Sequence, residues 1–259
     1  MGLLVDRVAI VTGASKGIGR AMSRLFAREG ARVVCAARSP ALVEETVSLI
    51  RKDGGDAIAV VADAGREQDV QAVVHAALAT FGTIDTLVNN AGDGGPTKPI
   101  QEYTIEDWFY TLNSCLTSSY LCTRFAVPAM IEAGRGAIVN IASVAGRRGL
   151  QYRVGYCAAK AGQIGMTYGL ATELGPHNIT VNAIAPGAVA GDRIEWMMEG
   201  QARARGTTVD ELRRSFIERA PLKRMSTAED VAQLAAFLCS DHARNISGQC
   251  IPVTAGEPG

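Results

Sequence analysis

The chain has 259 residues, of which 47% are hydrophobic, and its 26 Lys and Arg residues balance 26 Asp and Glu residues. Balanced charge provides no global field that would attract nucleic acid or an acidic membrane, so we expect a small-molecule partner. No uninterrupted apolar run reaches the roughly 18 residues that a membrane helix needs, and residues 1–13 lack the pattern of a secretory signal, so we expect a cytoplasmic protein without membrane association.

Short apolar runs rich in β-branched residues recur along the chain, and helical patterns lie between them. The runs cover residues 7–13, 32–38, 57–63, 84–92, 137–143 and 179–187, with a last candidate at 249–256. Most are almost continuously apolar, which is typical of strands covered on both faces. The helical patterns cover residues 17–29, 40–53, 66–81, 104–133 and 154–175. This alternation predicts an α/β fold with a doubly wound parallel sheet and helices on both faces.

No repeat, low-complexity tract or Pro/Gly-rich linker marks a domain boundary, so we expect one catalytic domain over residues 1–259. Residues 191–226 break the alternation because they are charged and helical in pattern. Within them, Thr208 and Glu211 have the spacing of a capping box, which predicts a second short helix. A segment that leaves the carboxyl end of a strand in an open α/β sheet lies where ligands bind, so we interpret residues 191–226 as a helical lid.

A glycine-rich turn, 12-TGASKGIG-19, follows the first predicted strand and opens the first predicted helix. Gly13, Gly17 and Gly19 let the backbone turn sharply and approach a pyrophosphate, while the helix presents its free N–H groups to that anion. Glycine spacing alone would be compatible with a simple turn. The position of this turn in an alternating chain favours a dinucleotide-binding site.

The end of the second predicted strand bears on the choice of dinucleotide. A site for NAD usually has an acidic residue there, whereas this chain has Ala36, Ala37 and Arg38. A guanidinium suits a 2′-phosphate, and Lys16 in the glycine turn adds a second positive charge. We therefore expect NADP(H), with NAD less favoured; the alternative is that Lys16 and Arg38 are ordinary surface cations.

Cysteine and histidine spacing argues against disulfides and metal ions. The chain has no C-x-x-C pair, so we expect its six cysteines to be free thiols that behave as small hydrophobic residues. The three histidines are far apart in the sequence, so we expect no metal site.

Tyr156 and Lys160 lie four residues apart and therefore share one face of the predicted helix 154–175. A nearby cation lowers the pKa of a phenol, which suits Tyr156 to general acid/base transfer near neutral pH. Ser143, at the end of a predicted strand, can hydrogen-bond a substrate oxygen. Tyrosine with lysine at i+4 is also common on solvated helices, but only Tyr156 among the six tyrosines has this partner.

Five motifs together resemble the compact branch of the short-chain dehydrogenase/reductase family over almost the whole chain. They are 12-TGASKGIG-19, 89-NNAG-92, Ser143 within 141-IASVAG-146, Tyr156-x-x-x-Lys160 and 186-PG-187. The resemblance implies a Rossmann fold of about seven strands and an oxidoreductase that interconverts a ketone and a secondary alcohol, similar to a 3-oxoacyl reductase. It also implies a homotetramer formed through the helices near residues 107–133 and 154–175.

By the same resemblance, Ser143, Tyr156 and Lys160 are the catalytic residues. The cofactor-binding residues that it implies are Gly13, Ser15, Lys16, Gly17, Ile18, Gly19, Arg38, Asp63, Ala64, Asn90, Ala91, Gly92, Tyr156, Lys160, Pro186, Gly187 and Val189. Asp63 and Ala64 would border the adenine, and the segment from Pro186 to Val189 would flank the nicotinamide.

The chain departs from the family pattern at two positions. The family usually has an asparagine before a leucine in the long central helix, where it completes a proton path to the lysine; this chain has Cys115 before Leu116. Asn113 lies two residues earlier, about 200° around a regular helix, so we expect the relay to run without it unless a local distortion turns it inward. Gly191 stands where the family often has a threonine near the nicotinamide.

Four arginines flank the presumed pocket, namely Arg147, Arg148, Arg153 and Arg193. They can bind an anionic substrate, or they can be solvated or salt-bridged as surface arginines usually are. The alternative function is a non-catalytic dinucleotide-binding sensor or scaffold, which Cys115 leaves open. The sequence identifies neither the substrate nor its stereochemistry.

Overall fold

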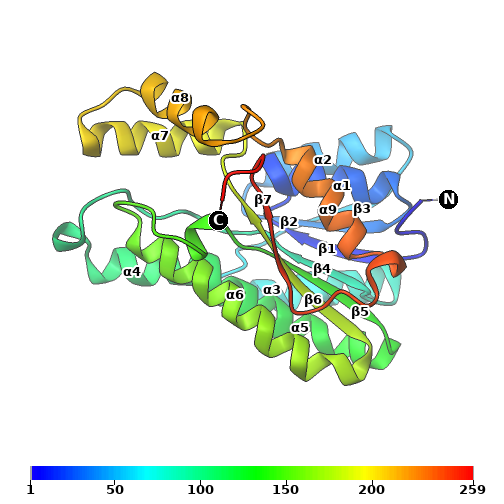
Figure 1. The fold of residues 1–259 in the computed structure, drawn as a ribbon. Helices are drawn as coiled ribbons and strands as arrows, with labels where there is room; N and C mark the ends of the chain where they lie inside the picture. The colour runs from blue at the N-terminus through cyan, green and yellow to red at the C-terminus, as the bar shows by residue number, and fades with distance from the viewer. Residues whose placement is uncertain (1, 259) are drawn as a thin grey trace.

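In a computed structural model, which describes residues 2–258, a seven-stranded parallel sheet forms the centre of the molecule (Figure 1). Its strands are β1 (Val8–Thr12), β2 (Arg32–Ala37), β3 (Asp56–Val61), β4 (Thr86–Asn89), β5 (Gly136–Ile141), β6 (Ile179–Pro186) and β7 (Cys250–Val253). Their order, β3-β2-β1-β4-β5-β6-β7, confirms the doubly wound parallel sheet that the sequence predicts. The chain reverses its direction of winding between β1 and β4, and ligands bind at such a switch point in α/β sheets.

Helices cover both faces of the sheet (Figure 1). One face carries α1 (Gly17–Arg28), α2 (Pro40–Lys52) and α9 (Ala228–Leu238), and the other carries α3 (Glu67–Phe81), α5 (Ser118–Ala133) and α6 (Val154–Leu174). Successive side chains of a strand point to opposite faces. Along β2, Val33 and Cys35 therefore pack in the first core, and Val34 and Ala36 pack in the second.

The helix expected over residues 104–133 is interrupted in the structure. It consists of α4 (Ile105–Leu112), a π-helical turn (Asn113–Thr117) and α5. The wider turn changes the backbone hydrogen-bond pattern, and the hydroxyl groups of Ser118 and Ser119 donate to the carbonyls of Ser114 and Cys115 at 2.8 and 3.1 Å. The helical pattern expected over residues 104–133 is therefore confirmed, but residue spacing gave no sign of the π-helical turn within it.

The segment after β6 forms α7 (Asp192–Arg205) and α8 (Val209–Arg219), which lie together beyond the carboxyl end of β6 (Figure 1). Thr208 begins α8 with the capping box that its spacing predicts: its Oγ1 accepts from the Glu211 N–H at 3.2 Å, and a Glu211 carboxylate oxygen accepts from the Thr208 N–H at 3.0 Å. The two helices share a small apolar cluster of their own, centred on Met198 and Leu212.

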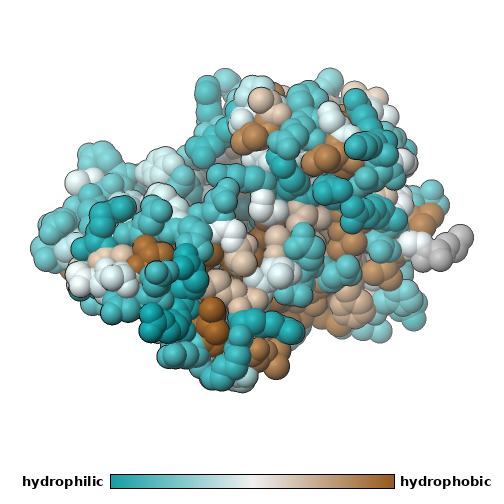
Figure 2. Space-filling view, turned by 90° about the horizontal axis from the view of Figure 1, so that it is seen from above, coloured by the Kyte–Doolittle hydropathy of each residue, from teal (hydrophilic) through white to brown (hydrophobic). Residues whose placement is uncertain are grey.

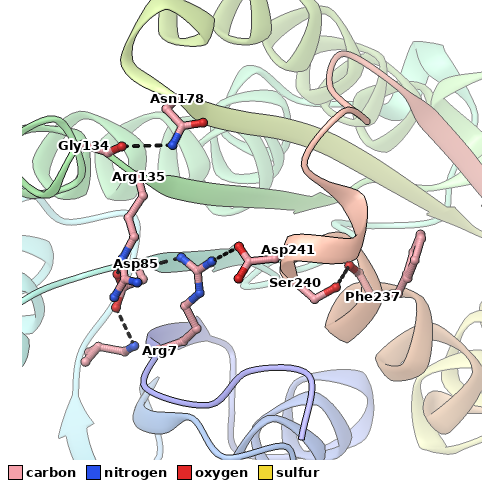
Figure 3. Close-up of polar contacts among 9 residues, drawn as sticks. Arg7, Asp85, Gly134, Arg135, Asn178, Phe237, Ser240 and Asp241 are labelled. Carbon is pink, nitrogen blue, oxygen red and sulfur yellow. Dashed lines mark hydrogen bonds and ion pairs between the residues drawn. The ribbon is translucent and has the colours of Figure 1, made fainter. Parts of the chain in front are cut away.

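An ion-pair network lies before β1 and β4, at the amino ends of the strands (Figure 3). The fully buried Asp85 carboxylate accepts from the Val8 N–H at 2.9 Å and from Arg135 Nε at 2.6 Å. Arg7 lies 4.0 Å from the same carboxylate and pairs with Asp241 at 2.5 Å. The network connects β1, β4, β5 and the segment after α9. It lies at the amino ends of the strands, away from their carboxyl ends.

All six cysteines are free thiols, as the sequence predicts. Burial raises the pKa of Cys35, Cys122 and Cys239 to about 12, so these thiols are unreactive near neutral pH. Across residues 2–258, no group of three or more His, Cys, Asp or Glu side chains is arranged to hold a metal ion.

The surface seen in Figure 2 is mostly hydrophilic, with apolar side chains in separate patches. In the part of the chain from residue 2 to residue 258, no helix has both the length and the apolar character that crossing a bilayer requires.

Candidate active site

A cavity of about 680 Å³ lies along the carboxyl ends of the strands, at the switch point of the sheet. Every residue that the sequence assigned to catalysis or to cofactor binding lines this cavity. The strands bring them together: the glycine turn follows β1, Arg38 follows β2, Asn90 follows β4, Ser143 follows β5 and Pro186 ends β6. Helix α7 adds Arg193, Ile194, Trp196 and Met197 to the lining.

The glycine turn after β1 is shaped by close backbone contacts. Gly13 has φ of +66°, which favours glycine, and a Cβ on Gly19 would overlap the Gly13 carbonyl oxygen. The Asn90 side-chain amide donates to the carbonyl oxygens of Thr12 and Gly13 at 2.8 and 3.2 Å, which fixes the turn from the neighbouring strand. The turn therefore forms a cradle: glycines stand where a ligand must come close to the protein backbone, so no side chain blocks its approach.

The N-terminus of α1 faces this cradle without a cap. Lys16 precedes the helix, no side chain caps its first N–H groups, and its first turn contains no acidic residue. Free N–H groups at a helix N-terminus bind phosphate oxygens. The glycine turn and α1 therefore fit the pyrophosphate of a dinucleotide.

Lys16 and Arg38 line the end of the cavity next to β2 and are both exposed. Among residues 2–258, neither forms an ion pair with a carboxylate. Asp63, which lines the same region, uses its carboxylate to accept from the Gly65 N–H at 2.9 Å. The two cations are therefore available to a phosphate group of a ligand.

Tyr156 and Lys160 point into the cavity from adjacent turns of α6. Lys160 is 3% exposed, and its Nζ lies 5.7 Å from the centre of the Tyr156 ring. Burial raises the pKa of Tyr156, but the charges of Lys160 and Arg193, with a smaller contribution from the Ser143 hydroxyl, outweigh it and lower the pKa below its usual value. The site can therefore move a proton through Tyr156 more readily than a free phenol can.

Ser143 is held at the end of β5 by the turn that follows it. Its Oγ accepts from the Ala145 N–H at 3.1 Å, which caps a short 3₁₀-helix (Val144–Gly146). This bond leaves the hydroxyl proton free to be donated. The serine can thus donate to a substrate oxygen beside Tyr156.

Gln163 is a site residue that the sequence analysis missed. The Lys160 ammonium donates to the Ile141 carbonyl and to the Gln163 side-chain oxygen, both at 2.7 Å. The Gln163 amide donates to Ser119 Oγ at 2.5 Å, and Ser119 donates in turn to the Cys115 carbonyl at 3.1 Å. The sequence feature that could have identified Gln163 is its position three residues after Lys160, which places both side chains on the inner face of one helix.

Asn113 and Cys115 occupy different places from the usual asparagine. The side-chain amide of Asn113 lies against Gly65, near β3 rather than near Lys160. The Cys115 sulfur packs on Gly92 and donates to the Asp93 carbonyl at 3.0 Å. The π-helical turn is the local distortion that could have turned Asn113 toward the lysine, but it leaves the amide facing elsewhere.

The four arginines near the pocket separate into two pairs. Arg147 donates to the Cys250 carbonyl at 3.0 Å, and Arg148 pairs at 2.7 Å with the buried Glu257, which also pairs with Arg219 of the lid at 3.0 Å. Arg153 and Arg193 lie beside Tyr156 instead, with guanidinium carbons 5.0 and 5.9 Å from its ring centre. The positive charge that flanks the pocket is thus concentrated at the tyrosine.

Comparisons with known proteins agree with this geometry. Residues 13–257 match a family profile described as enoyl-(acyl carrier protein) reductase. The chain is 40% identical over 255 residues to a protein of Streptomyces virginiae named as a ketoacyl reductase of the monensin polyketide synthase, covering 97% of each chain. It is 36% identical over 253 residues to the 3-oxoacyl-(acyl-carrier-protein) reductase FabG of Staphylococcus aureus (strain Mu50), covering 97% of this chain and 98% of the relative.

A solved structure shows the same fold over the whole length. The structure of NAD+-bound xylitol dehydrogenase superposes with a TM-score of 0.94 at 30% identity, covering 98% of this chain and 99% of that one. Both the sequence matches and the structural match extend over the cofactor cradle, the Tyr156 helix and helices α7 and α8. The chain therefore belongs to the short-chain dehydrogenase/reductase family and is an oxidoreductase.

Proposed function

We propose that the protein is an NADP(H)-dependent oxidoreductase that interconverts a ketone and a secondary alcohol, with Tyr156 as the general acid/base. The observation that carries the proposal is the position of Tyr156 in the shared cavity, where Lys160 and Arg193 lower its pKa against the effect of burial. A phenol with a lowered pKa exchanges protons with a substrate oxygen at a useful rate near neutral pH.

When bound, NADP(H) supplies or accepts a hydride at the nicotinamide. In ketone reduction, Tyr156 donates its hydroxyl proton to the carbonyl oxygen while the carbonyl carbon gains the hydride, so the C=O double bond becomes a C–O–H group. Ser143 donates a hydrogen bond to the same oxygen and stabilises its developing negative charge. Lys160 stabilises the resulting phenolate, which regains a proton from solvent. In alcohol oxidation, each proton moves in the opposite direction.

The residues around the cavity suit the parts of NADP(H) in turn. Gly13, Gly17 and Gly19 with the α1 N-terminus would hold the pyrophosphate. Lys16 and Arg38 would hold the 2′-phosphate, because both are exposed to the cavity and have no carboxylate partner among residues 2–258. Their arrangement favours NADP(H), although the similar xylitol dehydrogenase structure contains NAD+.

A 3-oxoacyl compound is one substrate class that the relatives suggest, since two of them are named as reductases of ketoacyl or 3-oxoacyl groups. The alternative of a non-catalytic sensor has no support in these comparisons. Ser143, Tyr156 and Lys160 are all present and line one cavity, which a protein without catalytic activity would have no need to retain.

We also propose that the protein is a cytoplasmic homotetramer and that its 259 residues form one domain. The helices expected at the subunit contacts carry exposed apolar and aromatic side chains, including Phe109 on α4, Tyr120 and Ile131 on α5, and Tyr168 on α6. Such side chains are suited to burial between subunits.

The test is an assay of a panel of ketones, 3-oxoacyl thioesters and polyols with NADPH, NADH and their oxidised forms. We expect turnover with NADPH that is lost in Tyr156→Phe, while circular dichroism shows that the variant keeps its fold. Full activity in Tyr156→Phe would refute the assignment of the general acid/base. A strong preference for NADH would refute the roles of Lys16 and Arg38.

A further inference from the structure

We propose that the substrate of this oxidoreductase is a keto acid, or the corresponding hydroxy acid, whose carboxylate is bound by Arg153 and Arg193. This inference rests on the proposed function, because it assumes that the carbonyl group is placed at Tyr156. It narrows the broad class of ketones to those with a negative charge a few carbons from the reacting carbonyl.

Arg153 is an almost completely buried cation in the wall of the cavity. Its exposed fraction is 3%, and its guanidinium lies between two aromatic rings, 5.0 Å from the centre of Tyr156 and 5.7 Å from that of Trp196. It donates to Thr97 Oγ1 and to the Gly94 carbonyl, both at 2.9 Å. Its buried Nε has no hydrogen-bond partner.

A buried guanidinium without a counterion is unfavourable, because it has lost water and gained no opposite charge. In the described part of the chain, residues 2–258, no carboxylate lies within ion-pair distance of Arg153. Burial correspondingly lowers the pKa of Arg153 from its ordinary value. A carboxylate on the ligand would supply the missing charge and an acceptor for the planar N–H fork.

Arg193, at the start of α7, brings a second guanidinium to the same place. It donates to the Gly92 carbonyl at 2.8 Å and lies 5.9 Å from the Tyr156 ring centre. It forms no ion pair with any carboxylate of residues 2–258. Arg153 and Arg193 therefore both lie near the phenol at which the reacting carbonyl would be placed.

The acidic residues near these arginines have other partners. Asp93 accepts from the Tyr110 hydroxyl at 3.0 Å and from the Gly95 N–H at 3.1 Å, so both of its oxygens are already bonded. Glu257 is held by Arg148 and Arg219. Asp192 and Asp63 also line the cavity, but neither pairs with Arg153 or Arg193.

The other cations of the pocket are not equivalent to this pair. Lys160 is satisfied by Ile141 and Gln163, and Arg148 is neutralised by Glu257. Arg147 lies outside the cavity lining and donates to a carbonyl. Arg153 and Arg193 are thus the cavity cations beside Tyr156 that form no ion pair with a carboxylate of residues 2–258, and this is where an anionic substrate group would be placed.

The kinetic test compares two keto acids, 4-oxopentanoate and 5-oxohexanoate, with their methyl esters, which have the same carbonyl but no charge. We expect kcat/KM with NADPH to favour at least one acid over its ester by about 10- to 100-fold, the value of a charge-assisted hydrogen bond. Arg193→Gln and Arg153→Gln should remove most of this preference, because the acid then loses more kcat/KM than its ester; any change in the pKa of Tyr156 affects the acid and the ester alike and cancels in their ratio. Arg147→Gln, which removes a charge outside the cavity, should leave both rates unchanged.

The binding test uses calorimetry of 4-oxopentanoate and 5-oxohexanoate with the enzyme–NADP+ complex, in which a ketone cannot react. We expect binding of an acid that weakens by about 10-fold or more in Arg193→Gln, with NADP+ affinity unchanged. Arg193 donates to the Gly92 carbonyl from the first turn of α7, outside the two main cores of the sheet, so this variant remains informative if Arg153→Gln fails to fold.

The proposal would be overturned if acids and esters bound equally well, or if the variants lost kcat/KM equally for both. Exclusive turnover of neutral thioesters would also overturn it. A loss of NADP+ affinity in Arg193→Gln would assign Arg193 to the cofactor and overturn its role here. If no ketone is reduced but the keto acid binds selectively, the proposed function fails and the anion site stands.

Discussion

The Lys160 ammonium lies 5.7 Å from the centre of the Tyr156 ring and is anchored at 2.7 Å by both the Ile141 carbonyl and the Gln163 side chain. Two fixed acceptors on one buried ammonium leave it little freedom to move. The charge that lowers the pKa of Tyr156 is therefore held in position by the fold, before any substrate arrives.

Replacement of Lys160 by methionine should raise the pKa of Tyr156, because burial then acts with less opposing charge. In alcohol oxidation Tyr156 must be deprotonated, so kcat/KM rises with pH and reaches a plateau above that pKa. We expect the midpoint of this rise to lie at higher pH in Lys160→Met than in the wild type. An unchanged midpoint would contradict the electrostatic role of Lys160.

Replacement of Gln163 by glutamate tests whether Gln163 positions Lys160. A carboxylate of the same shape beside the ammonium would offset its charge and raise the pKa of Tyr156, again moving the midpoint of alcohol oxidation to higher pH. KM should change little, because Gln163 does not line the cavity. Ser119→Ala, which removes the next hydrogen bond without adding charge, is the matched control and should leave the midpoint in place.

Replacement of Asn113 by alanine should leave turnover within a few-fold of the wild type. The Asn113 amide lies against Gly65, and the acceptors of Lys160 come from Ile141 and Gln163. Steady-state kinetics of Asn113→Ala, with circular dichroism to verify the fold, provide the measurement. A large loss of kcat in a folded variant would place Asn113 in the proton path.

Replacement of both Lys16 and Arg38 by glutamine should change cofactor preference. The variant loses two cations that have no carboxylate partner among residues 2–258 and should bind NADPH about 10-fold or more weakly, with NADH affinity nearly constant. Fluorescence titration of both reduced cofactors measures the effect. Arg24→Gln, which removes a paired surface arginine of α1, serves as the control.

Replacement of Asp85 by asparagine should lower the free energy of unfolding by about 3 kcal/mol, because it leaves Arg135 and the largely buried Arg7 without their shared carboxylate. Catalysis at 25 °C should persist, since the network lies at the amino ends of the strands (Figure 3). Asp53→Asn, which removes a more exposed partner of Arg24 and Arg28, should have a much smaller effect in the same urea denaturation experiment, because solvent screens exposed ion pairs.

The sheet and the positions of the cofactor-binding residues could be predicted from the sequence because they depend on local patterns. Continuous apolar runs identify buried parallel strands, and Gly13 and Gly19 are required by backbone geometry that tolerates few other residues. The Thr208 capping box likewise depends only on residues close in sequence.

Contacts between distant segments could not be predicted in this way. The π-helical turn at residues 113–117 has no signature in residue spacing, and the bond from Lys160 to the Ile141 carbonyl depends on how α6 packs against β5. The sequence grouped four arginines near the pocket, but only the structure shows that Glu257, more than 100 residues later, pairs with Arg148, whereas Arg153 has no carboxylate partner among residues 2–258.

Glu257 joins the loop after Ser143 to α8, because Arg148 and Arg219 both bind its carboxylate, at 2.7 and 3.0 Å. Movement of α8 away from the cavity must break one of these contacts. Because Glu257 is buried whereas Arg148 and Arg219 are partly exposed, dissolved salt weakens these contacts only in part, so ionic strength would have a modest effect on how readily the cavity opens to admit substrate and release product. The protein would thus exchange its ligands faster in concentrated electrolyte, until the salt also competes for the phosphate-binding cradle.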